Sequence, residues 1–243
     1  MTASGQSPIK LLTFSVWLII IPAICGAQQR APIAEQIGKA YGVDSFGQIE
    51  AIRYTFNIPE FKLSRTWVWE PKTDTVSYEG KDKQGNPVKV TYKRAELDRQ
   101  SDSVKKQIDP AFVNDHYVLL FPLHVAWDTW ATVTDEGMQE MPISKKSARR
   151  VAVKYPGEGG YSPGDTWELY VGKNHRIEEF VYRRGGTTYP TVYTATWAGH
   201  KKVGPLVVST ERAGTAEDGK RVTLLLTDVA VKVTGSEDWI NAQ

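Results

Sequence analysis

Short segments in which apolar and polar residues alternate recur along most of the chain. In Ile49–Asn57, for example, Ile52, Tyr54 and Phe56 share one face, and the polar residues between them share the other. Successive side chains of a β-strand point to opposite faces, so this alternation is typical of a strand with one buried face. Similar segments, bounded by polar turns, predict further strands over residues 66–70, 75–78, 88–92, 151–155, 166–171, 176–183, 191–197, 206–212 and 221–234.

The spacing of these segments predicts a mainly β (α+β) fold. Neighbouring strands are separated by turns that contain glycine, which favours an antiparallel meander over β-α-β units. Pro32–Tyr41 has a helical repeat of apolar residues instead, with proline in its first turn and Gly42 after its end. No linker or repeat divides the chain after residue 27, so we expect a single domain over residues 28–243.

One segment departs from the alternation. Asp109–Trp130 holds 13 apolar residues in 22. Asp109 and Pro110 fit the N-cap and first position of a helix, and Pro122 is expected to end that helix near Phe121. The charged and imidazole side chains within it argue against a membrane span. A helix this apolar must be buried, and the concave face of a curved sheet would bury it.

The first 27 residues have the layout of a secretory signal peptide. Lys10 precedes the apolar run Leu11–Ala23, and small residues stand at the −3 and −1 positions of a cut after Ala27. A membrane anchor or a buried helix is the alternative, but the flanks match cleavage better. We therefore expect a periplasmic or secreted protein.

Cys25, the only cysteine, falls within this leader. It could accept a lipid, but Pro22 and Ile24 fit a lipobox poorly, so lipoprotein anchoring is disfavoured. After cleavage near Ala27 the chain has no thiol, and therefore no disulfide and no cysteine metal site.

The charge balance limits the partners. The formal net charge is +2, which argues against nucleic acid or an anionic membrane surface as the main partner. The cations at Lys145–Arg150 are interleaved with serine and alanine, as in a solvated loop that leads into a strand. No transmembrane segment is expected in the mature chain.

No catalytic motif is present. His116 and His124 stand eight residues apart on either side of Pro122, while His175 and His200 fall in expected turns. None has the spacing of a zinc ligand. Glu178 and Glu179 would point to opposite faces of a strand, and Asp165 fits a turn better than a site. We therefore predict no catalytic residue, metal or cofactor, although a hydrolase with scattered residues stays open.

Aromatic residues offer the strongest hint of a function. Seven of the eight tryptophans follow the leader, and several lie in expected strands. They could fill an ordinary core, line an apolar hollow that admits a lipid or other hydrophobic molecule, or stack on sugars.

Several strings resemble the LolA/LolB-like superfamily of periplasmic carriers, and more specifically a related group of exported bacterial proteins of unassigned function. The resemblance spans nearly all of residues 28–243 and rests on Ala40–Gly42, Ile49–Phe56, Asp115–Pro122, Gly160–Val171 and Arg176–Arg183. It implies a strongly curved, incomplete antiparallel β-barrel wrapped around one or two helices, with a hydrophobic cavity between them. Known relatives carry or sense lipoproteins or lipids.

The resemblance and the apolar segment together favour a non-enzymatic binding protein that holds a lipid or other hydrophobic ligand in the half-barrel. The alternatives are an envelope protein- or glycan-interaction module and, third, an unrecognised hydrolase. The expected ligand-binding residues are Phe56, Trp67, Trp69, Phe112, Tyr117, Leu120, Phe121, Trp127, Trp167 and Trp197.

Overall fold

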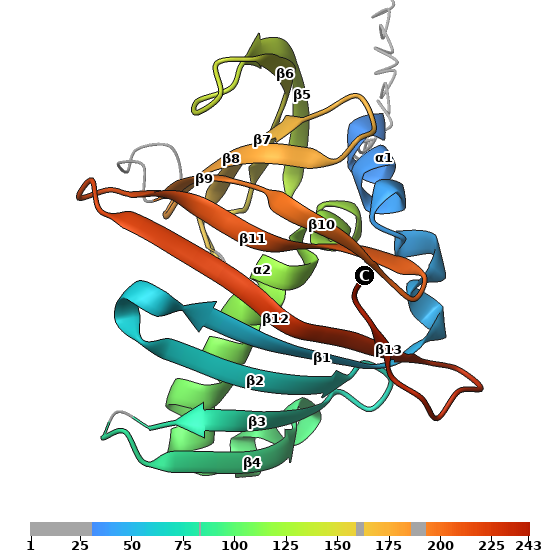
Figure 1. Ribbon diagram of the computed structural model, residues 1–243, viewed down its shortest axis with the longest axis vertical. Coiled ribbons are helices and arrows are strands. Elements are labelled where there is room, and N and C mark those ends of the chain that lie inside the picture. The colour runs from blue at the N-terminus through green and yellow to red at the C-terminus, as the bar shows by residue number, and fades with distance from the viewer. Residues whose placement is uncertain (1–30, 83, 159–162, 186–192) are drawn as a thin grey trace, which may run out of the picture.

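The computed structural model describes residues 31–243, apart from residue 83 and residues 159–162 and 186–192 (Figure 1). The expected signal peptide lies outside the described residues. The described residues share one large hydrophobic core, with a second small apolar cluster beside it.

The described residues form helices of several kinds: α1 (Pro32–Ala40), α2 (Asp109–Trp127), the short 3₁₀ helices η1 (Val43–Gln48), η2 (Pro59–Phe61) and η3 (Arg94–Arg99), and the π-helical turn η4 (Val104–Ile108). The strands are β1 (Ile49–Ile58), β2 (Leu63–Glu70), β3 (Thr75–Lys81), β4 (Pro87–Lys93), β5 (Thr132–Glu140), β6 (Ser147–Lys154), β7 (Thr166–Val171), β8 (Ile177–Arg183), β9 (Tyr193–Thr196), β10 (Ala198–Val203), β11 (Leu206–Ala216), β12 (Arg221–Val233) and β13 (Ile240–Asn241).

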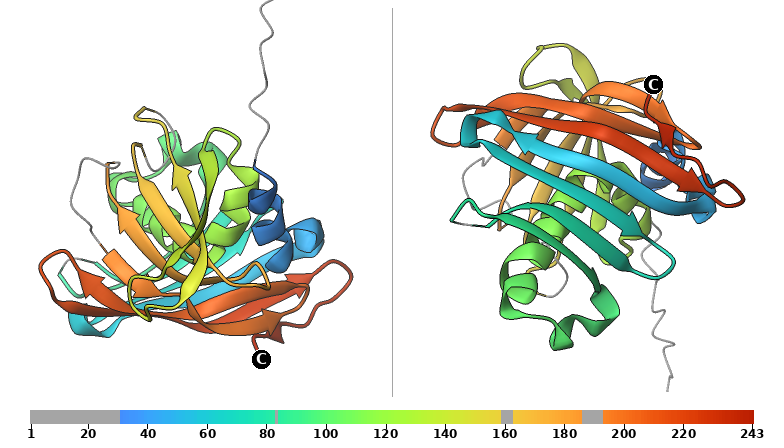
Figure 2. Two further views of the ribbon diagram at one scale, coloured as in Figure 1. Left: turned by 90° about the horizontal axis from the view of Figure 1, so that it is seen from above. Right: turned by 60° about the horizontal axis from the view of Figure 1, so that its bottom comes forward.

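All strands belong to one antiparallel sheet in the order β4-β3-β2-β1-β12-β11-β9-β8-β7-β6-β5. β10 pairs with β11, and β13 with β12. Within the described residues, β4 and β5 at the two ends of this path do not pair, so the barrel stays open. The sheet curves around α2 (Figure 2). The expected mainly β fold, an incomplete barrel wrapped around helices, is therefore confirmed.

Three strands were not predicted from the alternation, each for a physical reason. β5 carries mostly polar residues and is interrupted by a bulge between Asp135 and Met138. β10 contains a glycine and three basic residues among its six, so apolar and polar residues do not alternate along it, and it includes His200, which the sequence placed in a turn. β13 has only two residues.

The two α-helices contact each other on the concave side of the sheet. α1 packs on the C-terminal half of α2, and Gly38 allows the close approach, since a Cβ added there would lie 2.6 Å from the Cβ of Ala126. Among the described residues, no helix is both long and apolar enough to cross a membrane.

The expectation that Pro122 ends the buried helix is wrong. α2 continues through Pro122 to Trp127. A proline inside a helix leaves the carbonyl four residues earlier without its N–H donor, which normally destabilises the helix. Here that carbonyl belongs to Val118, and it accepts a hydrogen bond of 3.2 Å from Nη2 of Arg212 in β11. A side chain from the sheet thus replaces the missing donor.

Candidate functional site

The concave face and α2 bring together all ten residues that the sequence predicts to bind a ligand. Eight of them are buried, whereas Trp69 and Trp127 are half-buried. They come from β1 (Phe56), β2 (Trp67, Trp69), α2 (Phe112, Tyr117, Leu120, Phe121, Trp127), β7 (Trp167) and the residue between β9 and β10 (Trp197). Their role in binding a ligand stays a prediction.

Aromatic rings fill two parts of this face. Near β2, the ring of Phe112 lies 5.5 Å from that of Trp67. Near β7, Phe121 stacks on Trp167 at 4.2 Å and lies 6.3 Å from Trp197. α2 therefore occupies the middle of the concave face and contacts both halves of the sheet.

Buried carboxylates fix α2 to the strands. Asp115, fully buried in α2, accepts hydrogen bonds from Nη2 of Arg65 at 2.8 Å and from Nε1 of Trp67 at 2.9 Å. Burial raises the pKa of Asp115 to about 6, against the opposing effect of the Arg65 charge. The helix is thus held by a charged contact within an apolar interior.

Asp109 holds the start of α2 in a similar way. The sequence predicts it as the N-cap, but this is wrong, because the residue before it is already helical and follows directly from η4. The Asp109 carboxylate instead accepts hydrogen bonds from the hydroxyl of Tyr92 at 3.0 Å and from Nε of Arg94 at 2.8 Å.

A cluster of histidines and tyrosines surrounds the end of α2. Because α2 does not stop at Pro122, His116 and His124 lie on one side of the helix, with ring centroids 5.3 Å apart. This corrects the sequence-based view that the proline separates them. Nδ1 of His124 lies 3.1 Å from Asp128. The Asp128 carboxylate also accepts hydrogen bonds from Tyr117 and Tyr155, at 2.9 and 2.8 Å.

The electrostatics of this cluster favour a neutral His116 and an ionised Asp128. Burial, and then the neighbouring His124, lower the pKa of His116 well below its ordinary value. Burial raises the pKa of Asp128, but hydrogen bonds from His124 and the two tyrosines outweigh it and leave the pKa lowered.

Two observations on the described residues bear on catalysis and metal binding at this cluster. Nε2 of His124 is buried and has no hydrogen-bond partner among the described residues, so no hydroxyl nucleophile is held against it there. The part of the chain that the structure describes contains no group of three or more His, Cys, Asp or Glu that could hold a metal ion. The two histidines alone fall short of the ligand set of a zinc site.

Arg212 is the most unusual buried group. Only 1% of it is exposed, and its guanidinium lies 3.5 Å from the centre of the Trp197 ring. Nη1 donates to the carbonyl and hydroxyl oxygens of Ser209, at 3.1 and 2.7 Å, and to the carbonyl of Glu211 at 3.0 Å. Burial lowers the pKa of Arg212 to about 9, which leaves it charged at neutral pH.

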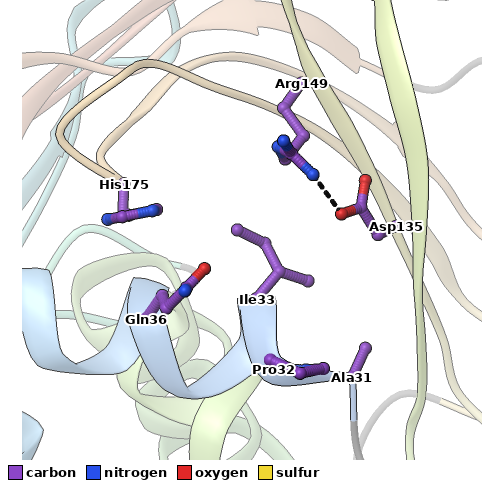
Figure 3. Close-up of a pocket in the computed structure, with 7 residues that line it drawn as sticks. All are labelled: Ala31, Pro32, Ile33, Gln36, Asp135, Arg149 and His175. Carbon is purple, nitrogen blue, oxygen red and sulfur yellow. Dashed lines mark hydrogen bonds and ion pairs between the residues drawn. The ribbon is translucent and has the colours of Figure 1, made fainter.

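Two open hollows lie outside the concave face. The first, of about 340 Å³, lies between the start of α1, the β5–β6 hairpin and the β7–β8 turn, with the ion pair of Arg149 and Asp135 on its wall (Figure 3). The second, of about 620 Å³, adjoins it and shares Arg149 and His175. None of the ten expected ligand-binding residues lines either hollow.

The sequence reasoning missed Arg212, Arg65 and the role of Asp115. A signal for Arg212 was present, because alternation within β11 places it on the same inward face as Leu206 and Val208. Arg65 likewise shares the inward face of β2 with Trp67. Charged residues at inward positions of apolar strands should have been treated as candidates.

Comparisons with known proteins give likenesses of fold only. No protein-family model matches the chain, and no curated protein matches it. Similar solved structures include a DUF1329 family protein from Desulfovibrio piger (9% identity, 85% of this chain and 95% of that one, TM-score 0.43) and the LolA superfamily protein NE2245 from Nitrosomonas europaea (8%, 82% and 91%, TM-score 0.43). The Mycobacterium tuberculosis lipoprotein LppX is more distant (9%, 82% and 94%, TM-score 0.28).

One of these structures is a LolA superfamily protein. At such low TM-scores and identities, the likeness concerns the general arrangement of strands and helices. It carries no argument about the function of this chain.

Proposed function

We propose that this protein is a non-enzymatic binding protein that holds a lipid or other hydrophobic molecule at one end of its concave face. We further propose that it works in the periplasm or outside the cell, after cleavage near Ala27. The proposal rests on how apolar side chains are distributed along the inner face of the open sheet.

The observation that carries the proposal is a group of half-buried apolar residues at one end of that face. We name this group the open end; it consists of Ile58, Leu63, Val88, Val118, Tyr182 and Tyr193. Its strand residues lie at the strand ends on the left of Figure 1.

Further inside, the same faces of the same strands are sealed. Phe56 is 1% exposed and Trp67 is fully buried, although each shares a strand and a face with a residue of the open end. α2 thus covers the middle of the apolar face and leaves this end partly uncovered. An apolar ligand that covers the open end would remove the remaining apolar surface from water, a gain of roughly 25 cal/mol per Å².

Two measurements test this function. The first is native mass spectrometry of the protein purified from the envelope of its own host, in which we expect a bound lipid or similar molecule. The second is uptake of the fluorescent probe N-phenylnaphthylamine by residues 28–243. Absence of both a bound molecule and probe uptake would overturn the proposal.

A matched pair of variants on β2 locates the site. Leu63→Lys places a charge in the open end, and we expect it to weaken probe binding by about tenfold or more. Val68→Lys places the same charge at a half-buried position on the opposite face of the strand and should leave binding unchanged. Equal effects of the two variants would count against the open end as the site.

A second candidate function is an interaction module for an envelope protein. The observation that favours it is the pair of adjoining hollows beside Arg149 and His175, which are open and lined by both polar and apolar groups. Affinity capture from envelope extracts tests it. A partner that is lost with Arg149→Glu, but retained after delipidation, would support this function over lipid binding.

A further inference from the structure

Unlike the half-buried Arg65 and Arg94, the buried Arg212 has no carboxylate counter-ion among the described residues. Arg65 pairs with Asp115, and Arg94 with Asp109, each at 2.8 Å. Among the described residues, Arg212 has no carboxylate within ion-pair distance, and its hydrogen bonds go to neutral oxygens only. A buried charge without a partner of opposite sign is costly, so its presence calls for an explanation.

The bond to Val118 explains only part of this arrangement. One N–H group would suffice to replace the donor that Pro122 lacks, and a neutral side chain could supply it. Nε of Arg212 is buried and has no hydrogen-bond partner among the described residues. The Nε–H group of this charged guanidinium therefore has no acceptor among the described residues.

The surroundings of Arg212 are apolar and rich in donors. Trp197 covers one face of the guanidinium at 3.5 Å. The ring of Phe180 lies 5.3 Å from Trp197 and 5.4 Å from Trp167. Nε1 of Trp167 is another buried N–H without a partner among the described residues. This region would accept an apolar molecule that brings its own negatively charged oxygen.

Arg212 also lies beside the open end. The hydroxyl of Tyr193 donates to the Arg212 carbonyl at 3.3 Å, and Val118 accepts from its guanidinium; both Tyr193 and Val118 belong to the open end. Arg212 stands four residues before the end of β11 at Ala216, which is about 13 Å along a strand. A chain-like ligand at the open end could therefore reach it.

We propose that the ligand is an amphipathic anion, an alkyl or acyl chain that ends in an anionic oxygen group, and that Arg212 binds this group. The inference rests on the proposed function and narrows its ligand class. A long-chain carboxylate and an alkyl phosphate share the required chemistry. Either would give Arg212 the counter-ion and the acceptor that the described residues do not supply, through charge-assisted hydrogen bonds.

Three ligands with the same chain test the proposal: dodecanoate, dodecyl phosphate and dodecanol, each displacing N-phenylnaphthylamine from residues 28–243. For the unmodified protein we expect at least one of the two anions to bind about tenfold tighter than dodecanol or better. The relative affinity of the two anions tells which head group the site prefers. If dodecanol binds as tightly as both anions, or if the probe binds but none of the three ligands displaces it, the inference fails while the proposed function stands. If the probe does not bind either and the purified protein carries no molecule, the proposed function fails as well.

Variants test the assignment to Arg212. Arg212→Gln should abolish the preference for the anion, so that the ratio of the anion affinity to the dodecanol affinity falls from about tenfold to about one. Arg221→Gln, which removes an exposed cation from the same hairpin, is the matched control and should keep the preference. A preference retained in Arg212→Gln would overturn the assignment. Should that variant not fold, Arg212→Lys, which keeps the charge, should retain a preference for the anion, and its loss there would overturn the assignment.

Discussion

Nη2 of Arg212 donates a hydrogen bond of 3.2 Å to the carbonyl oxygen of Val118, across 94 residues of chain. The bond links β11 to the middle of α2 at the one carbonyl that Pro122 deprives of its helical donor. It explains how a proline can stand inside the buried helix α2. It also makes the helix dependent on a strand that follows it in the sequence.

The dependence of α2 on Arg212 can be measured with a double-mutant cycle. Pro122→Ala restores an N–H group for the Val118 carbonyl. We therefore expect Arg212→Met to lower the free energy of unfolding by about 1 kcal/mol less in the Pro122→Ala background than in the unmodified protein. Urea unfolding followed by tryptophan fluorescence gives the four free energies. An equal cost in both backgrounds would show that the bond does not compensate for the proline.

The raised pKa of Asp115 predicts a pH-dependent contribution to stability. The folded pKa is about 6 and the ordinary value 3.8, so between these pH values the folded state binds a proton that the unfolded chain releases. The contribution of this group is therefore fully present below the ordinary value, and it is lost as the pH rises through about 6. The difference amounts to at most about 3 kcal/mol.

Asp115→Asn removes this contribution. Relative to the variant, the unmodified protein should become more stable as the pH falls from about 7.5 to about 5. Urea unfolding of both proteins at the two pH values shows whether this difference in stability increases or decreases as the pH falls. Glu211→Gln, at an exposed position of β11, is the control. A difference that is constant, or that changes in the opposite direction, would contradict the raised pKa.

The contact between α1 and α2 predicts a cost for a single methyl group. Gly38→Ala would place a Cβ 2.6 Å from that of Ala126, so we expect the free energy of unfolding to fall by about 1–3 kcal/mol although alanine favours helices. Ala126→Gly should recover part of the loss. Gly47→Ala, where a Cβ would meet no atom within 4 Å, is the matched control. Thermal unfolding measures the stability of all four proteins. If Gly38→Ala is as stable as the unmodified protein, the two helices can move apart at no cost in free energy.

Glu179 predicts a local effect at the tip of the β5–β6 hairpin. Its buried carboxylate accepts hydrogen bonds from the main-chain N–H groups of Ile143 and Ser144, at 2.7 and 2.9 Å. Glu179→Ala should speed amide hydrogen exchange at these two residues by about tenfold or more. Glu178→Ala, at the neighbouring exposed position, should leave both rates unchanged. Equal exchange in the two variants would show that the tip is held by other contacts.

The strands could be predicted because each carries its own signal. Alternation identified β1 within one residue and β7 at both ends, since most inward positions are apolar whatever the partner strand is. β5 could not be found in this way, because its residues are mostly polar. The candidates in strands, such as Phe56, Trp67 and Trp167, were found for the same reason, whereas those in α2 came from the apolar character of Asp109–Trp130.

The length of α2 and the buried charges could not be predicted from local pattern. Whether Pro122 ends the helix depends on a donor far along the chain, and no local rule contains that information. Likewise, Asp115 looks like a polar residue in an apolar segment until the sheet brings Arg65 to it. Such features are decided by contacts between distant segments, and they are also the ones that define the proposed ligand class.

The pairing of β1 with β12 has a consequence for how the chain acquires its structure. Glu50 and Thr234 hydrogen-bond across 184 residues, so the centre of the sheet joins two segments from nearly opposite ends of the described chain. Closing so large a loop costs entropy before the pairing repays it, which slows folding. β1 therefore cannot pair fully until β12 is available. A chain that is still being synthesised, or is still passing through a pore, cannot yet form the centre of its sheet.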